Sequence, residues 1–250
     1  MTHVLLLDMD ECLAPSNNVV GNGMLNIYKD MDAAHHGTIT KSFLELKEAL
    51  NSYAVKVPKT LKNITTGFIW SRELWLKHVS DKNGLGLDDK AIMKLIDAYW
   101  DAVALASQAY DDSLNFLKLQ NKKMLFIITG SDRRLIMTNN EIKYDPKFSE
   151  KKKIKRIHKQ GVKSFFPTSH IITGDPYDKP STEFWERVMK HVGIKNKSYG
   201  IVVDDSMSIV LDAVKFGFSG YVLDRRGLYK KQDVKHKVTG YLTKLNDLHL

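Results

Sequence analysis

Five short apolar runs constrain the fold of this chain most strongly, because their apolar residues follow one another without alternating with polar ones. The runs are His3–Asp8, Met124–Thr129, His170–Thr173, Tyr199–Asp204 and Ser219–Asp224. Continuous runs of this length are typical of parallel strands that helices cover on both faces. We therefore predict an α/β fold built on a doubly wound, mainly parallel sheet.

The segments between the later strands have the pattern of amphipathic helices. Ser181 is a plausible N-cap for a helix with the apolar stripe Phe184, Trp185, Val188, Met189 and Val192. A second helix is predicted from Ser206 to about Gly217. We expect Val238–Leu250 to form a last short strand and helix. Strand, helix and strand in this order predict a Rossmann-like core of three layers.

A long segment separates the first strand from the second. Connections inside such a fold are usually about 2–6 residues before the next element begins, so this segment must have structure of its own. Ile39–Leu50 and Ile92–Ala106 both show helical spacing. We predict a catalytic core formed by residues 1–13 and 111–250, and a second, smaller, all-helical cap domain at 14–110, placed to act as a lid over the strand ends.

Composition limits the classes of protein to which the chain can belong. It has 250 residues and a single cysteine, Cys12, which excludes an internal disulfide framework. No apolar run approaches the roughly 20 residues that span a bilayer, and Val4–Leu7 is too short for a signal peptide. We expect a soluble, cytoplasmic protein without a membrane partner.

The net charge of +9 is concentrated in two stretches. Lys147–Lys163 has eight basic residues against one acid, and Arg225–Lys237 has six against one. Such stretches favour anionic ligands and are compatible with nucleic-acid binding. A solvated lysine-rich face is the more common explanation of a charge run, so nucleic acid is not the partner we expect.

Acidic and polar residues stand where several predicted strands end. They are Asp8 and Asp10, then Thr129, Gly130 and Ser131, and finally the pair Asp204 and Asp205. Because parallel strands end at the same sheet edge, these residues should converge. Four carboxylates there would repel one another unless a cation or a proton intervened. Oxygen ligands without His or Cys favour Mg²⁺, which we predict as the cofactor.

Phosphoryl transfer suits this set of side chains. A carboxylate beside Mg²⁺ can attack phosphorus and form an aspartyl-phosphate, while a carboxylate two residues on acts as acid and then as base. The phosphoryl oxygens also need positive charge and hydrogen-bond donors. The hydroxyl of Thr129 and the amides of Gly130 and Ser131 are candidates for this contact. Lys179, just before Pro180 and a helix start, is a further one.

Over nearly its whole length the chain resembles the haloacid dehalogenase superfamily. The first motif of that superfamily is an apolar strand ending in DxD, which Leu5–Asp10 matches. The second is an apolar strand ending in Thr or Ser, which Phe126–Thr129 matches. The third motif is a lysine at a helix start, matched by Lys179, and the fourth is an apolar strand followed by acids, matched by Val202–Asp205. A DxD triplet alone occurs by chance, but four motifs in order on the predicted elements are specific. The segment 14–110 resembles the family's cap in its position.

The resemblance implies a role for each matched residue. Asp8 would be the nucleophile, and Asp10 would protonate the leaving oxygen and then activate water. Thr129 and Lys179 would hold the phosphoryl group. Asp205, with Asp204 beside it, would complete the Mg²⁺ site together with Asp8 and the backbone carbonyl of Asp10.

The expected activity is hydrolysis of a small phosphate monoester. Family members that cleave carbon–halogen or phosphonate bonds lack an acid at the position of Asp10. A phosphomutase shares all four motifs and remains an alternative. A protein phosphatase is a minor one, suggested by the acid Glu11 after DxD. An anion- or nucleic-acid-binding member without catalysis is the alternative from another class.

Some residues depart from the family pattern or are ambiguous. Glu11-Cys12-Leu13 stands where the family usually has Gly-Thr-Leu, and Cys12 is expected to fill space rather than to react. His35-His36 is expected in a surface loop, and the cap tryptophans in a core. The cap cations that are candidates for contact with a substrate are Arg72 and Lys77.

Overall fold

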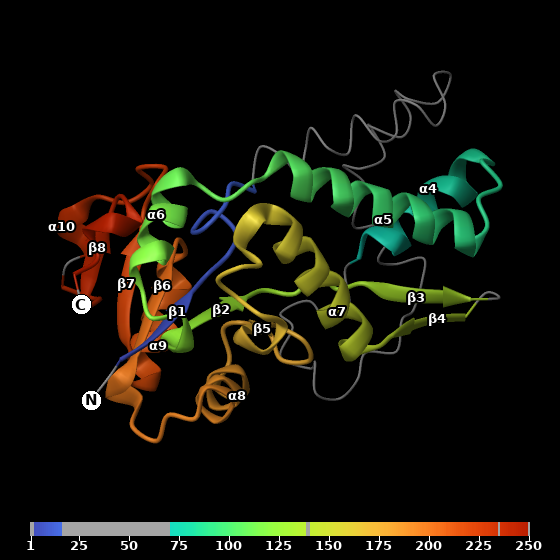
Figure 1. The fold of residues 1–250 in the computed structure, drawn as a ribbon. Coiled ribbons are helices and arrows are strands. Elements are labelled where there is room, and N and C mark those ends of the chain that lie inside the picture. The colour runs from blue at the N-terminus through green and yellow to red at the C-terminus, as the bar shows by residue number, and fades with distance from the viewer. Residues whose placement is uncertain (1–2, 17–70, 139–140, 235, 250) are drawn as a thin grey trace.

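A six-stranded parallel sheet organises the part of the molecule that lies at the left of Figure 1. The computed structural model describes residues 3–16, 71–138, 141–234 and 236–249. The strand order is β5-β2-β1-β6-β7-β8. The strands are β1 (Val4–Leu7), β2 (Leu125–Thr129), β5 (Ile171–Thr173), β6 (Gly200–Asp204), β7 (Ser219–Leu223) and β8 (Gly240–Leu242). The five strands predicted from continuous apolar runs are all present, and the predicted doubly wound α/β fold is confirmed.

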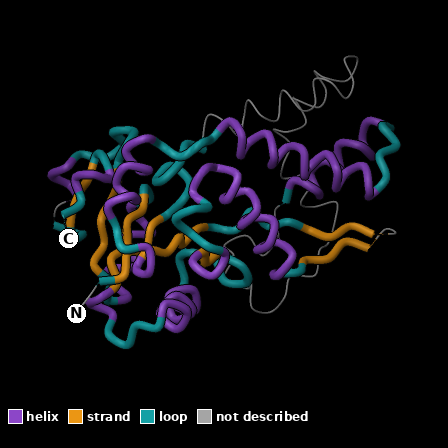
Figure 2. Tube along the Cα trace, in the orientation of Figure 1, coloured by secondary structure: helices purple, strands orange, loops and turns teal. Residues whose placement is uncertain are grey.

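Helices cover both faces of the sheet, as Figure 2 shows. Leu5 and Leu7 of β1 face one layer, which includes α6 (Asp111–Leu119) and α7 (Pro146–Ile157). Val4 and Leu6 of the same strand face the other layer, made by α8 (Thr182–Val192) and α9 (Met207–Phe216). Successive side chains of a strand point to opposite faces, so burial on both sides requires an unbroken apolar run. Here the sequence pattern and the packing agree.

The helix ends follow the expected capping chemistry. The hydroxyl of Ser181 accepts a hydrogen bond from the amide of Phe184 at 3.1 Å, and α8 ends at Gly193 with φ 72°. Gly217, with φ 112°, ends α9, as glycine can because it has no Cβ. The predicted last strand and helix correspond to β8 and a short turn.

Several shorter helical segments complete the core. They are α10 (Lys231–Val234) and the turns Lys122–Met124, His158–Val162, Thr168–His170, Lys197–Tyr199 and Leu245–Asp247. Within the described ranges, no helix combines the length and apolar character that crossing a bilayer requires.

A second apolar cluster lies outside the sheet. It joins α4 (Arg72–Asn83) and α5 (Asp89–Ala106) to a hairpin of β3 (Leu135–Thr138) and β4 (Glu141–Tyr144). The buried members of the cluster are Trp75, Leu76, Val79, Ile92, Ile96, Tyr99, Trp100, Val103 and Met137. The predicted helix over Ile92–Ala106 is thus present.

The hairpin of β3 and β4 is not predicted from the sequence, and it lies beyond the expected end of the cap at residue 110. Its strands have four residues each, and β4 has no buried side chain. Their apolar partners come from α4 and α5, more than thirty residues earlier, so no local pattern marks the hairpin. The helix expected over residues 39–50 lies outside the described residues, and the two-domain division stays a prediction.

Shortening Met137 tests whether this hairpin belongs to the helical cluster. Met137 is 3% exposed against α4 and α5, so Met137→Ala should lower the free energy of unfolding by about 2–3 kcal/mol through lost contacts and a residual cavity. Urea denaturation followed by tryptophan fluorescence measures this. The neighbouring Thr138→Ala, at an exposed position, should change stability by less than about 0.5 kcal/mol. Equal effects of the two changes would contradict the packing.

Candidate active site

One ammonium group joins the ends of β1 and β6. Lys179 Nζ lies 2.8 Å from Asp8 Oδ1 and 2.5 Å from Asp204 Oδ2, and it donates a hydrogen bond to the carbonyl of Ile128 at 3.0 Å. Asp8 follows β1, Asp204 ends β6, and these strands are neighbours in the sheet. The structure therefore brings together three residues that the sequence predicted to converge.

Burial dominates the electrostatics of this group. Burial raises the pKa of Asp8 to about 8; Lys179 opposes the rise, and the nearby carboxylates of Asp204 and Asp10 add to it. Burial disfavours the charge of Lys179, but Asp204 and Asp8 outweigh it and hold the pKa of that lysine above its usual value. The lysine is thus a permanent cation.

The end of β2 supplies neutral groups to the same edge. Thr129 is fully buried, and its hydroxyl finds no hydrogen-bond partner among the described residues. A buried donor without a partner costs about 1–3 kcal/mol, so an oxygen acceptor brought to it would be stabilised. Gly130 is exposed, and no atom lies within 4 Å of where its Cβ would be. The strand end therefore leaves room beside an unsatisfied hydroxyl.

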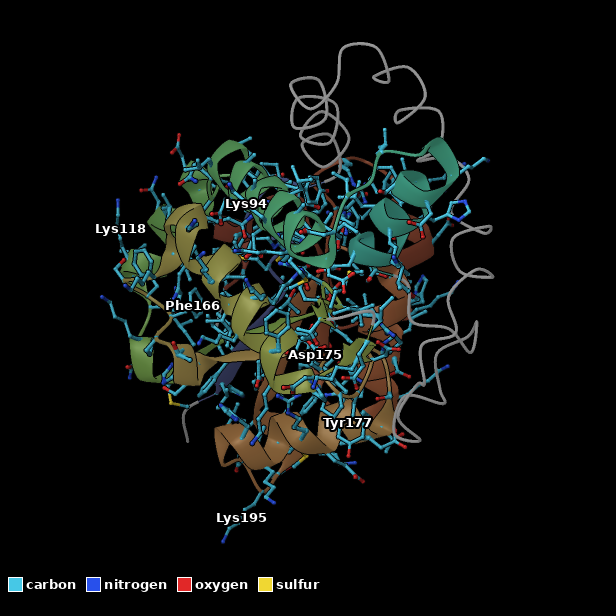
Figure 3. All side chains as sticks on the ribbon, turned by 90° about the vertical axis from the view of Figure 1, so that its right-hand side faces the viewer. Lys94, Lys118, Phe166, Asp175, Tyr177 and Lys195 are labelled. Atoms are coloured by element: carbon cyan, nitrogen blue, oxygen red, sulfur yellow. The ribbon has the colours of Figure 1, made fainter. Side chains whose placement is uncertain are left out.

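Ser131 uses its hydroxyl within the protein. It donates to Asp175 Oδ1 at 2.6 Å and accepts from the amide of Arg133 at 2.8 Å. Tyr144 of β4 also donates to Asp175, which is buried and is labelled near the middle of the view in Figure 3. This buried carboxylate ties the hairpin to the loop after β5, and burial raises its pKa. The predicted phosphate contact of Ser131 is thereby left to its backbone amide.

Asp205, which follows Asp204 directly, has an ion-pair partner of its own. Asp205 Oδ2 lies 3.1 Å from Arg226, and the same guanidinium lies 3.9 Å from Glu11 Oε2. Burial and the adjacent Asp204 raise the pKa of Asp205 to about 6. Glu11 has φ 64°, in the left-handed region that favours glycine, the residue usual at this position in the family that the sequence resembles.

The donor types at this edge fit a magnesium ion. Asp8, Asp204 and Asp205 offer carboxylate oxygens, the ligands that a hard cation prefers. In the described part of the chain, however, no group of three such side chains is already gathered around one point. Lys179 and Arg226 hold the carboxylates instead, so a bound ion requires these contacts to rearrange.

Asp10 is held by two cations of α7. Arg156 donates to it from both terminal nitrogens at 3.0 and 2.7 Å, and Lys153 Nζ lies 2.9 Å away. The same two side chains contact Asp132 at 2.9 to 3.5 Å. Burial opposes ionisation, but Arg156 and then Lys153 keep the pKa of Asp10 well below its usual range.

The residues that hold Asp10 are not predicted from the sequence as parts of the site. Lys153 and Arg156 are three positions apart and therefore share one face of a helix, but they lie within a long basic run. Asp132 lies three residues after Thr129, where the second motif ends, and this position is the signal that the sequence offers for it. The acid–base role of Asp10 stays a prediction, and in this arrangement its carboxylate is the ionised form.

Trp100 links this network to α4 and α5. The guanidinium of Arg72 lies 4.4 Å from the Trp100 ring centroid, and that of Arg156 lies 5.2 Å from it. Arg134 and Lys152 both pair with Asp97 of α5, at 2.8 and 2.5 Å. Cation–aromatic and ionic contacts therefore couple the helices outside the sheet to the residues that hold Asp10.

For the remaining candidate residues, the contacts found lie away from the acids at the strand ends. Lys77 lies 3.5 Å from Asp81 on its own helix, and Trp75 is in the core of the second cluster. Cys12 is buried, and burial first, then the nearby carboxylates, raise the pKa of its thiol well above the usual value, which suits a filler. His35-His36 and Trp70 lie outside the described residues.

Removing the guanidinium of Arg156 tests the network around Asp10. Arg156→Met leaves Asp10 and Asp132 short of counter-charge in a buried setting, so the free energy of unfolding should fall by about 3 kcal/mol. Adding Asp132→Asn should recover at least about 1 kcal/mol, because the two positions are in contact. Urea denaturation of the single and double variants measures both changes.

Lys155 provides the matched control, because it neighbours Arg156 but is 57% exposed. Lys155→Met should change stability by less than about 0.5 kcal/mol. An Arg156→Met variant as stable as the parent chain would show that the network contributes nothing to folding.

Comparison with known proteins adds the family context. A model of haloacid dehalogenase-like hydrolases matches residues 2–213. None of the curated proteins matches the chain significantly. Among solved structures, the HAD-hydrolase YfnB from Bacillus subtilis, bound to magnesium, is 13% identical with a TM-score of 0.59, covering 99% of this chain and 97% of its own.

Two further structures share the fold at similarly low identity. A 2-haloacid dehalogenase from Pseudomonas syringae pv. tomato is 13% identical with a TM-score of 0.63, covering 99% of this chain and 96% of its own. A HAD phosphatase from Thermococcus onnurineus is 15% identical with a TM-score of 0.57, covering 99% and 95%. The strand-end residues and the match over residues 2–213 lead to one conclusion: this chain belongs to the haloacid dehalogenase-like hydrolase family.

Proposed function

We propose that this hydrolase is a magnesium-dependent phosphate monoester phosphatase that acts through an aspartyl-phosphate on Asp8. The observation that carries the proposal is the ammonium of Lys179, which lies between Asp8 and Asp204 at the end of the sheet. The partnerless hydroxyl of Thr129 lies at the end of β2, the neighbouring strand. A nucleophilic carboxylate, a fixed cation and a free donor are the parts that phosphoryl transfer needs.

In the first step an oxygen of Asp8 attacks the phosphorus, a P–O bond to Asp8 forms, and the P–O bond to the alcohol breaks. Lys179 and Thr129 interact with the phosphoryl oxygens as their charge shifts. In the second step water attacks the aspartyl-phosphate, which releases inorganic phosphate and restores the carboxylate. Magnesium, held by Asp8, Asp205 and the carbonyl of Asp10, would supply positive charge beside the same oxygens.

Asp10 acts as general acid and then as general base in this scheme. Its carboxylate is ionised while Arg156 and Lys153 hold it, as a general base must be. The same two cations lower its affinity for a proton, so accepting one from the attacking water in the second step requires these contacts to loosen. Protonating the leaving alcohol in the first step requires Asp10 first to take up a proton from solvent and then to exchange these contacts for the substrate.

Carbon–halogen hydrolysis is the principal rival, because dehalogenases are among the structural neighbours. At this level of identity those neighbours indicate the fold alone. The acid Asp10 at the end of the DxD motif favours phosphate esters. Parallel assays of chloride released from 2-chloro acids and of phosphate released from a panel of sugar and nucleoside phosphates separate the two activities, and product analysis of the sugar phosphates detects a mutase.

Asp8→Asn tests the nucleophile. The amide is of nearly the same size but cannot form the acyl-phosphate, so kcat for phosphate release should fall by at least about 10³-fold. The measurement is phosphate release from p-nitrophenyl phosphate with Mg²⁺. Asp111→Asn, at an exposed helix start, is the matched control and should retain activity. Undiminished hydrolysis by Asp8→Asn would disprove the mechanism.

Removal of magnesium tests the cofactor. Chelation should abolish phosphate release, and added Mg²⁺ should restore it. Asp205→Asn should raise the Mg²⁺ concentration for half-maximal activity by about tenfold or more, because one charged ligand is lost. Activity that is indifferent to chelation would contradict the metal-dependent mechanism, while Asp8→Asn still tests the nucleophile separately.

A further inference from the structure

The basic residues of α7 and the turn after it divide into two sets. Lys152, Lys153 and Arg156 point inward and pair with Asp97, Asp10 and Asp132. The other five lysines line one groove on the surface: Lys147, Lys151, Lys155, Lys159 and Lys163. The charge run in the sequence is therefore not one uniform solvated face.

The five groove lysines are spaced at every fourth position. Side chains four apart lie above one another on a helix. From Lys147 to Lys159 the helical rise gives a row about 18 Å long. One strand of nucleic acid places about five phosphates along that length. The row thus has the length and linear form of a short stretch of phosphodiester backbone.

Little negative charge offsets this row. Asp101 lies 2.7 Å from Lys159 and 4.0 Å from Lys155. The one acid that lines the groove, Glu150, pairs with Arg187 at 2.8 Å. Among the described residues, no ion pair is found for Lys147, Lys151 or Lys163. Like charges four positions apart destabilise a helix by about 0.2–0.5 kcal/mol for each pair, so an anionic ligand along the row would relieve repulsion.

The two arginines of the second basic stretch differ in this respect. Arg225 is turned into the protein, where it contacts Asp112 at 3.0 Å and the carbonyl of Cys12. Arg226 pairs with Asp205 near the strand ends. The lysines of that stretch, Lys230, Lys231 and Lys237, have no ion pair among the described residues either, but they do not follow one another at every fourth position. The regular row of lysines along one groove is therefore a property of α7 and the turn after it.

The shape of the groove distinguishes a nucleic-acid backbone from a membrane. The groove has a volume of about 630 Å³, and its lining also includes the polar His158 and Thr168. Ile154, the apolar residue in it, is 9% exposed. A membrane surface favours exposed large apolar side chains beside the cations, and those of the described residues, Leu105, Leu119 and Leu228, do not line this groove.

We propose that the lysine groove of α7, defined by Lys147, Lys151, Lys155, Lys159 and Lys163, binds the phosphate backbone of a nucleic acid without reading its sequence. Lysine ammonium groups contact phosphate oxygens as point charges, so recognition is electrostatic and falls steeply with salt. The proposal does not depend on the phosphatase activity, because none of these lysines contacts the strand-end residues.

Fluorescence anisotropy of labelled oligonucleotides tests the groove. Two single strands of about 20 nucleotides and unrelated sequence should bind the intact chain equally well, in the micromolar range at low salt. The triple change K147Q/K151Q/K163Q breaks no observed ion pair and places good helix formers on the surface. It should weaken binding at least tenfold and reduce the slope of log K against log salt by about three, one for each lysine.

The control removes the same charge from another face. Lys190, Lys195 and Lys215 are exposed on or beside α8 and α9, and Figure 3 shows Lys195 projecting away from the body of the molecule. K190Q/K195Q/K215Q should bind nearly as well as the parent chain, and K147R/K151R/K163R should keep full binding because the charges remain. Thermal unfolding confirms that each variant is folded.

Three results would overturn the proposal. The first is an equal loss of affinity in the groove and control triples, which would reflect net charge alone. The second is no binding of either oligonucleotide at 50 mM salt. The third is binding to phosphatidylserine vesicles that depends on the groove lysines while the oligonucleotides do not compete.

Discussion

The contact of Lys179 with Asp8 and Asp204 is the interaction on which the rest of the strand-end arrangement depends. Parallel strands with acids at their carboxyl ends force like charges together, and burial there makes the repulsion strong. A lysine from the loop before α8 supplies the missing cation at 2.8 and 2.5 Å. Under the proposed function, this charge is also the one that binds the anionic phosphoryl group.

Helix α7 repeats this principle on a larger scale. Its inward cations neutralise Asp10 and Asp132 and meet Trp100, so they join the core, the site and the helices outside the sheet. Among the described residues, its outward lysines form ion pairs only through Lys155 and Lys159, both with Asp101. One helix therefore uses its charge in two ways, because residues three or four apart share a face while intervening positions turn to the other side.

How far the sequence predicts the structure depends on where each partner lies. Local sequence patterns predict strand β1 and the helix N-cap at Ser181. The rule that parallel strands end at the same sheet edge predicts that Asp8 and Asp204 converge. Two features were not predicted because the residues that form them are distant in the chain. One is the hairpin of β3 and β4, and the other is the set of hydrogen bonds from Ser131 and Tyr144 to Asp175. Asp10 illustrates the limit: its place was predictable, but its two cations were not.

By itself, then, the sequence determined the α/β fold and the places of five of its strands along the chain, and it indicated which acids, threonine and lysine to expect near the strand ends. Periodicity and connection rules suffice for these because they act along the chain. Only the tertiary structure decided which charges meet: Lys179 with two carboxylates, Arg156 with Asp10, and five lysines in one open groove. Pairing of charges depends on distance and burial in space, which a charge run in a sequence does not specify.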